Sequence, residues 1–333
     1  MSLSEDSQDH LPWVIAVCTI LSLAFVVGIP GNAFVIWTIC GRMKQRSATV
    51  VLILNLAIAD LLVLGTLPIW IYSIAHTWLF GLVACRFLTF LVYCSMYASI
   101  FLIMALSLER FIAVFYPFAA QRWKKKRATY AGVLTIWFLS IAFGAVVIPF
   151  RGTVSEDTGL DCMSYNYTSN SQLTACLLLE TLVGFVIPFA IISTCYVCVG
   201  RRIGKMTCPS RRRSARLISS VVVAFALCWL PHHVFNTISV VSALMEDSYP
   251  ETARELEDIS NMGVYIAGAV AFLSSCINPL LYAFAARNFQ SSVRLAKLSK
   301  LFEQMAPSVR QEATKEATSL TGKEETLTSM EMI

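Results

Sequence analysis

Ionisable side chains inside long apolar stretches are the residues of this 333-residue chain that could carry chemistry. Asp60 ends the run Leu-Ala-Ile-Ala-Asp, Glu180 stands eight residues before Pro188, and the adjacent pair Glu109 and Arg110 closes another apolar stretch. Where such a stretch crosses a membrane, a charged side chain costs several kcal/mol unless it is paired or hydrated. Each of these residues is therefore a candidate functional group that needs a partner.

Oxygen-bearing side chains in two other apolar stretches could accompany Asp60. They are Ser95, Ser99, Ser274, Ser275 and Asn278. A carboxylate among hydroxyl and amide oxygens suits a hard cation or a shared proton. A neutral, hydrogen-bonded aspartate that fills a packing gap fits the same residues equally well.

The other charges can be paired in more than one way. Glu109 and Arg110 can satisfy one another in a resting state and leave an arginine that can change partner. An interfacial pair that reaches toward lipid headgroups would have the same sequence. Arg151, at the end of the fourth apolar stretch, is the natural counter-charge for Glu180.

Composition shows which elements must position these groups. Hydrophobic residues make up 56% of the chain, charged residues only 14%, and the mean hydropathy is +0.65. A soluble domain has about 25% charged residues, so the surplus apolar surface must face lipid. A membrane-spanning helix needs about 20 apolar residues. The segments long enough are 12–40, 47–75, 82–115, 126–150, 173–203, 212–244 and 258–285. We predict an all-α membrane protein with a seven-helix transmembrane bundle over residues 12–285.

Orientation follows from the basic residues. They gather in the connections after spans one, three and five and after span seven, whereas the other side has only Arg86, Arg151 and Arg254. The positive-inside rule then places the N-terminus outside the cell and the C-terminus in the cytosol. The glycosylation acceptor Asn166, in Asn-Tyr-Thr, falls in an outer connection, as this topology requires.

The two ends of the chain have different compositions. Residues 1–11 contain no Lys or Arg, unlike a signal peptide, so we expect a short extracellular N-terminus before a retained first span. Residues 287–303 predict an amphipathic cytoplasmic helix that binds anionic headgroups, often numbered helix 8. Residues 304–333 are polar and predicted to be disordered. Candidate phosphorylation sites for receptor kinases, and hence for arrestin, are Thr314, Thr318, Ser319, Thr321, Thr326, Thr328 and Ser329.

Most of the eleven cysteines lie in apolar runs, where a thiol acts as a small hydrophobic group. Cys85 and Cys162 lie at span edges or connections on the predicted outer side. Because that compartment is oxidising, we expect a disulfide between them.

Short motifs in every predicted span resemble the signature of the rhodopsin-like (class A) G-protein-coupled receptors. The matching residues are Gly31-Asn32, Leu56–Asp60, Cys85, Ser107–Phe111, Trp137, Pro188, Phe225–Pro231 and Asn278–Tyr282. The ordered set covers residues 20–303. It implies a plasma-membrane receptor that signals through heterotrimeric G proteins.

Within this class the chain is most similar to the leukotriene B4 receptors, which bind a chemoattractant lipid carboxylate. The stretches that carry this resemblance are Ser95–Ser99, Phe150-Arg151, Leu179–Thr181, Gly184-Phe185, Pro231–Asn236 and Ala271–Ser275. The resemblance implies a pocket between spans three, five, six and seven that binds leukotriene B4 or a related hydroxy fatty acid. The candidate ligand-binding residues are Tyr97, Arg151, Glu180 and Asn236 by this resemblance, with Trp229, His232 and His233 beside them in span six.

Three positions depart from the leukotriene receptor pattern. Thr89 stands where those receptors have a histidine, Val264 where they have a basic residue, and His232 where a tyrosine is expected. These differences affect the prediction of which ligand binds, but not the assignment to the receptor class.

The resemblance also implies a two-state switch. Glu109-Arg110-Phe111 replaces the usual Asp-Arg-Tyr, and Arg211–Arg213 stand where an acid is usual at the foot of span six. We therefore expect appreciable basal activity, and the short basic third inner loop is associated with inhibitory G proteins. The switch residues are Glu109, Arg110, Tyr196, Asn278, Pro279 and Tyr282. The candidate ligands for an allosteric sodium ion are Asp60, Ser99, Ser274 and Asn278, and no other cofactor is expected.

Other classes of membrane protein fit less well. A transporter usually has internal repeats with broken helices, and the chain shows no such symmetry. An enzyme would need a catalytic set or metal ligands within the spans. His232 and His233 point about 100° apart on a helix, so they do not easily share one metal. Neither an enzyme nor a nucleic-acid-binding protein is expected. A chemoattractant peptide or chemokine receptor is the alternative, because the outer rim is acidic.

Overall fold

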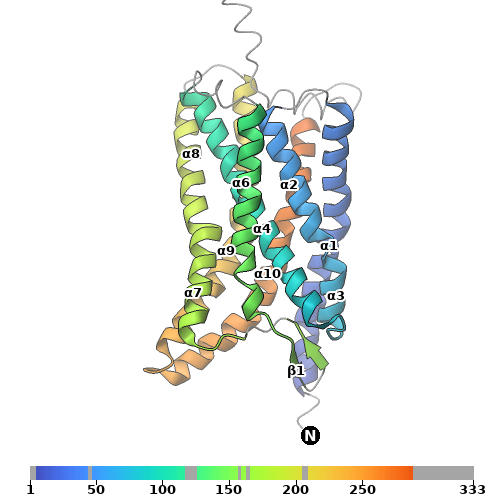
Figure 1. Ribbon diagram of the computed structural model, residues 1–333, viewed down its shortest axis with the longest axis vertical. Helices are drawn as coiled ribbons and strands as arrows, with labels where there is room; N and C mark the ends of the chain where they lie inside the picture. The colour runs from blue at the N-terminus through green and yellow to red at the C-terminus, as the bar shows by residue number, and fades with distance from the viewer. Residues whose placement is uncertain are drawn as a thin grey trace, which may run out of the picture.

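The structure is a computed structural model that describes residues 5–43, 47–116, 126–156, 159–162, 166–204 and 209–287. Long helices run side by side along one axis, and short connections lie at the two ends (Figure 1). The elements are α1 (Glu5–Arg42), α2 (Ala48–Leu64), α3 (Leu67–Ala75), α4 (Gly81–Phe115), α6 (Lys126–Ala145), η1 (Ile148–Phe150), β1 (Val154–Glu156), β2 (Gly159–Asp161), α7 (Asn170–Thr181), the π-helical turn η2 (Leu182–Val186), α8 (Ile187–Gly204), α9 (Pro209–Met245) and α10 (Pro250–Arg287).

Within the described ranges, seven helical spans are long and apolar enough to cross a membrane, as predicted. They are Pro12–Arg42, Ala48–Ala75, Gly81–Phe115, Arg127–Phe150, Asn170–Arg202, Val223–Met245 and Pro250–Pro279. Several spans combine two or three elements: α2 continues into α3, and α7 passes through η2 into α8. The predicted seven-helix membrane bundle is therefore confirmed. The predicted amphipathic helix and tail lie outside the described residues.

α4 lies at the centre of the bundle. It packs against α2, α6 and α8, while α9 packs along α10 and α1 packs against α2 and α10. Ile100 and Leu102 of α4 are fully buried. By contrast, Leu134 and Phe138 of α6 are each 70% exposed. Apolar side chains this exposed along an entire bundle are expected to contact lipid.

Two features differ from the sequence prediction. α10 begins at Pro250, not near residue 258, because a proline suits the first helical position and Glu251 stabilises the first turn. The connection after η1 contains a small antiparallel hairpin in which Val154 pairs with Asp161. Both features lie beyond the apolar run, where hydropathy carries no signal.

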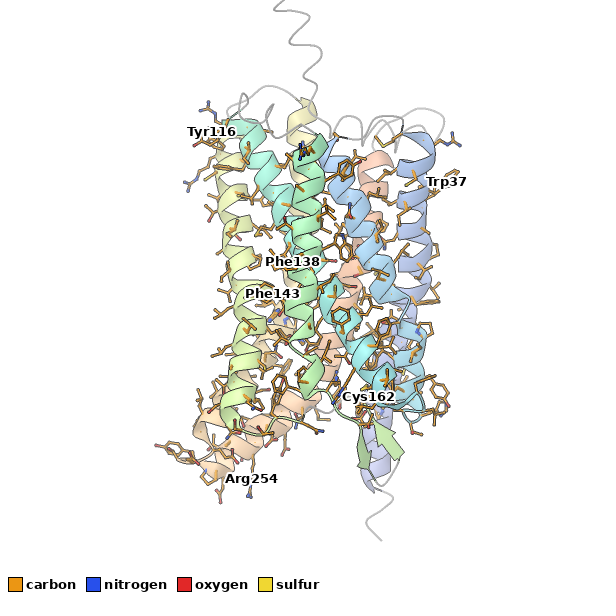
Figure 2. The ribbon with its side chains drawn as sticks, in the orientation of Figure 1. Trp37, Tyr116, Phe138, Phe143, Cys162 and Arg254 are labelled. Carbon is orange, nitrogen blue, oxygen red and sulfur yellow. A yellow bond between two sulfur atoms is a disulfide. The ribbon has the colours of Figure 1, made fainter. Side chains whose placement is uncertain are left out.

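The two ends of the bundle are distinguished by their residues. The Cys85–Cys162 disulfide, the hairpin and the start of α1 lie at one end, which we call the disulfide end (Figures 1 and 2). Trp37 and Tyr116 lie toward the opposite end (Figure 2).

Candidate ligand-binding site and switch

A hydrogen-bonded cluster surrounds the carboxylate of Glu180, which is only 6% exposed. Its Oε1 atom lies 2.7 Å from Nε2 of His232 and accepts a hydrogen bond of 3.1 Å from Nδ2 of Asn236. Its Oε2 atom accepts a hydrogen bond of 3.2 Å from the hydroxyl of Tyr93. Three helices, α4, α7 and α9, therefore meet at one buried carboxylate, and an imidazole is its closest partner.

Local helix geometry brings these groups together. His232 and Asn236 are four residues apart, so both side chains lie on one side of α9. Glu180 stands just before η2, and a π-helical turn holds one residue more than an α-helical turn. The bulge changes which side chains of the following α8 face the bundle.

His233 lies beside this cluster and is 3% exposed. Its ring stacks on Phe185 with centroids 4.8 Å apart, and its Nδ1 atom lies 3.4 Å from Oγ1 of Thr181. A side-chain carbon added at Gly184 would lie 3.5 Å from the Tyr97 ring and 3.8 Å from His233. Gly184 thus lies next to both Tyr97 and His233, two predicted ligand-binding residues.

Trp229 connects the Glu180 cluster to α10. Its ring meets His232 edge-on at 5.8 Å and stacks on Phe225 at 5.7 Å. Its Nε1 atom donates a hydrogen bond of 3.1 Å to the hydroxyl of Ser274. A displacement of His232 would therefore change the packing of Trp229 and, through Ser274, its contact with α10.

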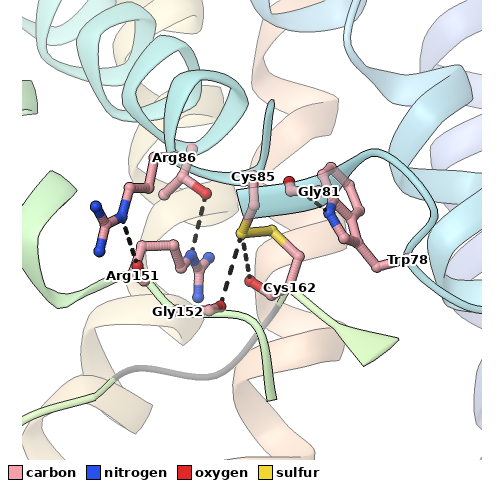
Figure 3. The surroundings of a disulfide bond; sticks show 8 residues. Trp78, Gly81, Cys85, Arg86, Arg151, Gly152 and Cys162 are labelled. Carbon is pink, nitrogen blue, oxygen red and sulfur yellow. Dashed lines mark hydrogen bonds between the residues drawn. A yellow bond between two sulfur atoms is a disulfide. The ribbon is translucent and has the colours of Figure 1, made fainter. Parts of the chain in front are cut away.

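Arg151 lies at the disulfide end and is 6% exposed. Its Nε atom donates a hydrogen bond of 3.0 Å to the hydroxyl of Thr89, and its carbonyl oxygen accepts one of 3.0 Å from Nε of Arg86 (Figure 3). Arg151 had been expected as the counter-charge of Glu180. It is not among the partners of that carboxylate, because His232 takes this place from α9.

The predicted disulfide between Cys85 and Cys162 is confirmed. It joins the first turns of α4 to the segment after β2, with Cα atoms 5.7 Å apart (Figure 3). Both residues are fully buried. The bond ties the connection that carries Arg151 to the helix that carries Thr89.

At the opposite end, Glu109 and Arg110 form the expected pair. Nε of Arg110 lies 3.7 Å from Oε2 of Glu109. A third group, not predicted, completes this arrangement: the hydroxyl of buried Thr49 lies 2.9 and 2.8 Å from the two carboxylate oxygens. The same hydroxyl accepts a hydrogen bond of 2.9 Å from a terminal nitrogen of Arg110. Threonine is common in apolar spans, so the sequence did not single this one out.

Asp60 is 1% exposed and bonded to two helices. Its Oδ1 atom accepts a hydrogen bond of 3.4 Å from Ser99, and its Oδ2 atom accepts one of 2.9 Å from Asn278. The hydroxyl of Ser95, four residues before Ser99, is buried without a partner in the described part of the chain. These oxygen donors fit a small hard cation. Ser274, the fourth candidate ligand, accepts from Trp229.

The remaining predicted residues lie as follows. Asn278 and Pro279 belong to α10, and Tyr196 lies in α8 with its hydroxyl buried. Asn166 is exposed near the disulfide end, where its backbone N–H donates to the carbonyl of Phe150 at 2.7 Å. The side chains of Tyr282 and Arg211–Arg213 lie outside the described part of the structure.

Comparison with known proteins identifies the class. Residues 31–282 match the family described as "7 transmembrane receptor (rhodopsin family)". The chain therefore belongs to the rhodopsin family of seven-transmembrane receptors. It is a receptor rather than an enzyme, and family membership implies an activating ligand, a heterotrimeric G protein and a multi-pass location in the plasma membrane.

Individual relatives show which receptors within this family the chain is similar to. Leukotriene B4 receptor 1 of Homo sapiens is 37% identical over 287 residues, which cover 85% of this chain and 80% of the relative. Chemerin-like receptor 2 of Mus musculus is 32% identical over 280 residues, covering 82% and 76%. The C3a anaphylatoxin chemotactic receptor of Oncorhynchus mykiss is 32% identical over 314 residues, covering 91% and 82%. The chain is thus related to leukotriene B4 receptors and to chemoattractant receptors.

Proposed function

We propose that this receptor responds to an extracellular chemoattractant lipid, leukotriene B4 or a related hydroxy fatty acid, and signals through G proteins of the inhibitory class. The observation that carries the proposal is the separation of two polar sites. The buried cation of Arg151 lies at the disulfide end. The cluster around Glu180 lies ten residues after Asn170, the first residue of α7, which is a rise of about 15 Å along that helix. A molecule with an acid at one end and hydroxyl groups along an apolar chain matches both.

Arg151 is the residue proposed to bind the carboxylate. Thr89 accepts a hydrogen bond from its Nε atom and so orients the guanidinium group, whose planar shape and charge suit a carboxylate. Leukotriene B4 receptors have a histidine at the position of Thr89 and a basic residue at that of Val264. With neither present, Arg151 is the principal cation for the ligand acid.

The proposed topology places the disulfide end outside the cell. The exposed glycosylation acceptor Asn166 lies there, and a disulfide requires an oxidising compartment. Basic residues Arg42, Arg201 and Arg202 close helices at the opposite end, in agreement with the positive-inside rule.

The proposed mechanism is a shift between two packings of the helices. An agonist that moves His232 would move Trp229, and the missing hydrogen bond at Pro231 provides a hinge in α9. Arg110, Tyr196 and Tyr282 would then rearrange to admit the G protein. A sodium ion held by Asp60, Ser99 and their neighbours would stabilise the resting packing.

The tail has a separate proposed role. Receptor kinases would phosphorylate its serine and threonine residues and so create a binding site for arrestin, while residues 287–303 would bind the lipids of the inner leaflet.

A peptide ligand is the second candidate, and the acidic disulfide end favours it. Acidic residues crowd the start of α10 and the turn before it: Glu246, Asp247, Glu251, Glu255, Glu257 and Asp258. A basic peptide would be attracted to this rim. Relatives whose names include chemerin and C3a anaphylatoxin add to this alternative.

A dose–response screen separates the candidates. Cells that express the full chain are exposed to leukotriene B4, monohydroxy eicosatetraenoic acids and chemoattractant peptides, and inhibition of cyclic AMP formation is measured with and without pertussis toxin. Toxin-sensitive responses to the hydroxy acids support the proposal. A response to peptides alone contradicts it.

A further inference from the structure

Exposed apolar side chains gather at the disulfide end, on the connection between α3 and α4 and on the first turns of α4. We call this surface the turn patch, and its members are Leu79, Phe80, Leu82, Val83 and Phe87. Val83 is 84% exposed and Leu79 is 65% exposed, so neither packs into the bundle. Single exposed hydrophobic residues are ordinary, but a contiguous group of them marks a surface that contacts a membrane or a partner.

The turn beneath the patch is firmly packed. Trp78 is fully buried, with its ring 5.7 Å from that of Trp70 and edge-on to Phe80 at 5.2 Å. Its Nε1 atom donates a hydrogen bond of 2.9 Å to the carbonyl of Gly81, which closes the turn with a φ of 73° that glycine adopts readily (Figure 3). Because Trp78 takes the inward position, Leu79 and Phe80 are held on the outside of the turn.

The turn patch continues the lipid-facing surface of the second span. Exposed residues of α2 and α3 recur every three or four positions: Leu62, Gly65, Pro68 and Tyr72. The patch begins at Leu79, and residues 61–85 contain no Asp, Glu, Lys or Arg. No charge therefore separates the exposed face of this span from the patch, and one partner, the bilayer, can cover both.

The position of the turn indicates how deep the patch lies. Only residues 76–80 separate α3 from α4, so this connection stays close to the span ends. The start of α1 and the part of α10 that carries Arg254 extend farther in the same direction (Figures 1 and 2). The backbone of the turn is not helical, which excludes it from the hydrocarbon interior. The headgroup region suits such a turn, and aromatic side chains such as Tyr72 and Phe80 are at home there.

We propose that the turn patch inserts into the boundary between headgroups and acyl chains of the lipid leaflet at the disulfide end. The partner is the phospholipid itself, because the patch offers apolar and aromatic contact without any charge. The patch is directly followed by Cys85, whose disulfide ties α4 to the segment after β2. An inserted patch therefore fixes the depth of this end of α4 relative to the bilayer.

The test measures lipid contact at single positions of the full chain. An environment-sensitive fluorescent amino acid replaces Leu79, and the purified receptor is placed in phosphatidylcholine nanodiscs with one copy in each disc. Separate discs contain lipids with a nitroxide quencher near the headgroup or in the middle of the acyl chain. Fluorescence at residue 79 should shift to shorter wavelengths, and the shallow nitroxide should quench most of it. The same probe at Phe138 in α6 should be quenched more by the deep nitroxide, whereas at exposed Thr252 in α10 neither should quench it.

A second position guards against local disruption of the turn. The probe at Val83 should behave like the probe at residue 79, and an unchanged melting temperature of the receptor identifies the folded variants. If both positions gave the emission and the weak quenching of residue 252, the patch would face water and the proposal would be wrong. A shift to shorter wavelengths that appeared only in discs with two receptor copies would also overturn it, because a second copy would then cover the patch.

Discussion

The hydroxyl of Thr49 lies 2.8 and 2.9 Å from the two carboxylate oxygens of Glu109 and joins α2 to α4 at the end opposite the disulfide. The same hydroxyl accepts from Arg110, so the partners of the arginine include Glu109 on its own helix and Thr49 on α2. Both contacts must be exchanged before Arg110 can turn toward a G protein. The Thr49 hydroxyl on α2 therefore stabilises the described position of the Arg110 side chain.

Removing this hydroxyl should raise basal signalling. Thr49→Val keeps the shape of the side chain but loses its hydrogen bonds, and one buried hydrogen bond contributes about 0.5–1.5 kcal/mol. A shift of that size changes a two-state ratio by about two- to tenfold. Binding of a non-hydrolysable GTP analogue to membranes without ligand, normalised to surface receptor, measures the effect. Thr49→Ser keeps the hydroxyl, so its basal binding of the GTP analogue should equal that of the wild type. Basal binding in wild-type membranes should itself exceed that in mock-transfected membranes. Equal basal binding in the valine and serine variants would count against this role.

Replacing Arg151 should weaken the response to a lipid acid. An arginine–carboxylate hydrogen bond contributes about 1.5–3 kcal/mol, so Arg151→Ala should lower agonist potency by about tenfold or more. Arg151→Lys keeps the charge but loses the planar group that Thr89 holds, and an intermediate loss is expected. Concentration–response curves for leukotriene B4 provide the measurement. Unchanged potency at normal surface expression would contradict the proposed role of Arg151 in binding the carboxylate.

The sequence was sufficient to predict the spans and the disulfide. Apolar runs of sufficient length imply membrane helices because unpaired backbone groups are too costly in lipid. Cys85 and Cys162 stood at the predicted outer side, and they form the bond. The start of α10 was placed too late, since its first turns are charged and leave no trace in hydropathy.

Partners across helices could not be predicted in the same way. Glu180 was assigned Arg151 because the two have opposite charge, but its closest partner is His232. Which side chains meet depends on helix rotation and on the η2 turn, and neither follows from composition. Thr49 and Tyr93 were overlooked for the same reason: a hydroxyl becomes informative only when the carboxylate it faces is known.

Sodium should reduce agonist affinity through Asp60. A cation held by the Asp60 carboxylate would stabilise one packing of the bundle and lower the affinity of a ligand that prefers the other. In the wild-type protein, replacing an organic cation with sodium at constant ionic strength should weaken agonist binding several-fold. Asp60→Asn keeps a hydrogen-bonding side chain of the same size but removes the charge, so the sodium effect should disappear. Potassium serves as the ion control. An identical sodium effect in the asparagine variant would place the cation elsewhere.

A pair of glycines in α10 tests how tightly α9 and α10 pack beside the ligand cluster. A side-chain carbon at Gly263 would overlap the ring of Phe235, the residue before Asn236, whereas Gly268 has no atom within 4 Å of the same position. Overpacking of this kind costs about 1–3 kcal/mol. Replacement of a helical glycine that has open space around it by alanine raises the free energy of unfolding by up to about 1 kcal/mol.

Gly263→Ala should therefore lower the apparent melting temperature of the purified receptor by several degrees. It should also weaken binding of leukotriene B4, because a displaced Phe235 would carry the adjacent Asn236 with it. Gly268→Ala should leave both unchanged or raise the melting temperature slightly. If Gly263→Ala proved as stable as Gly268→Ala, the close contact between α9 and α10 at Phe235 would not exist in the folded receptor.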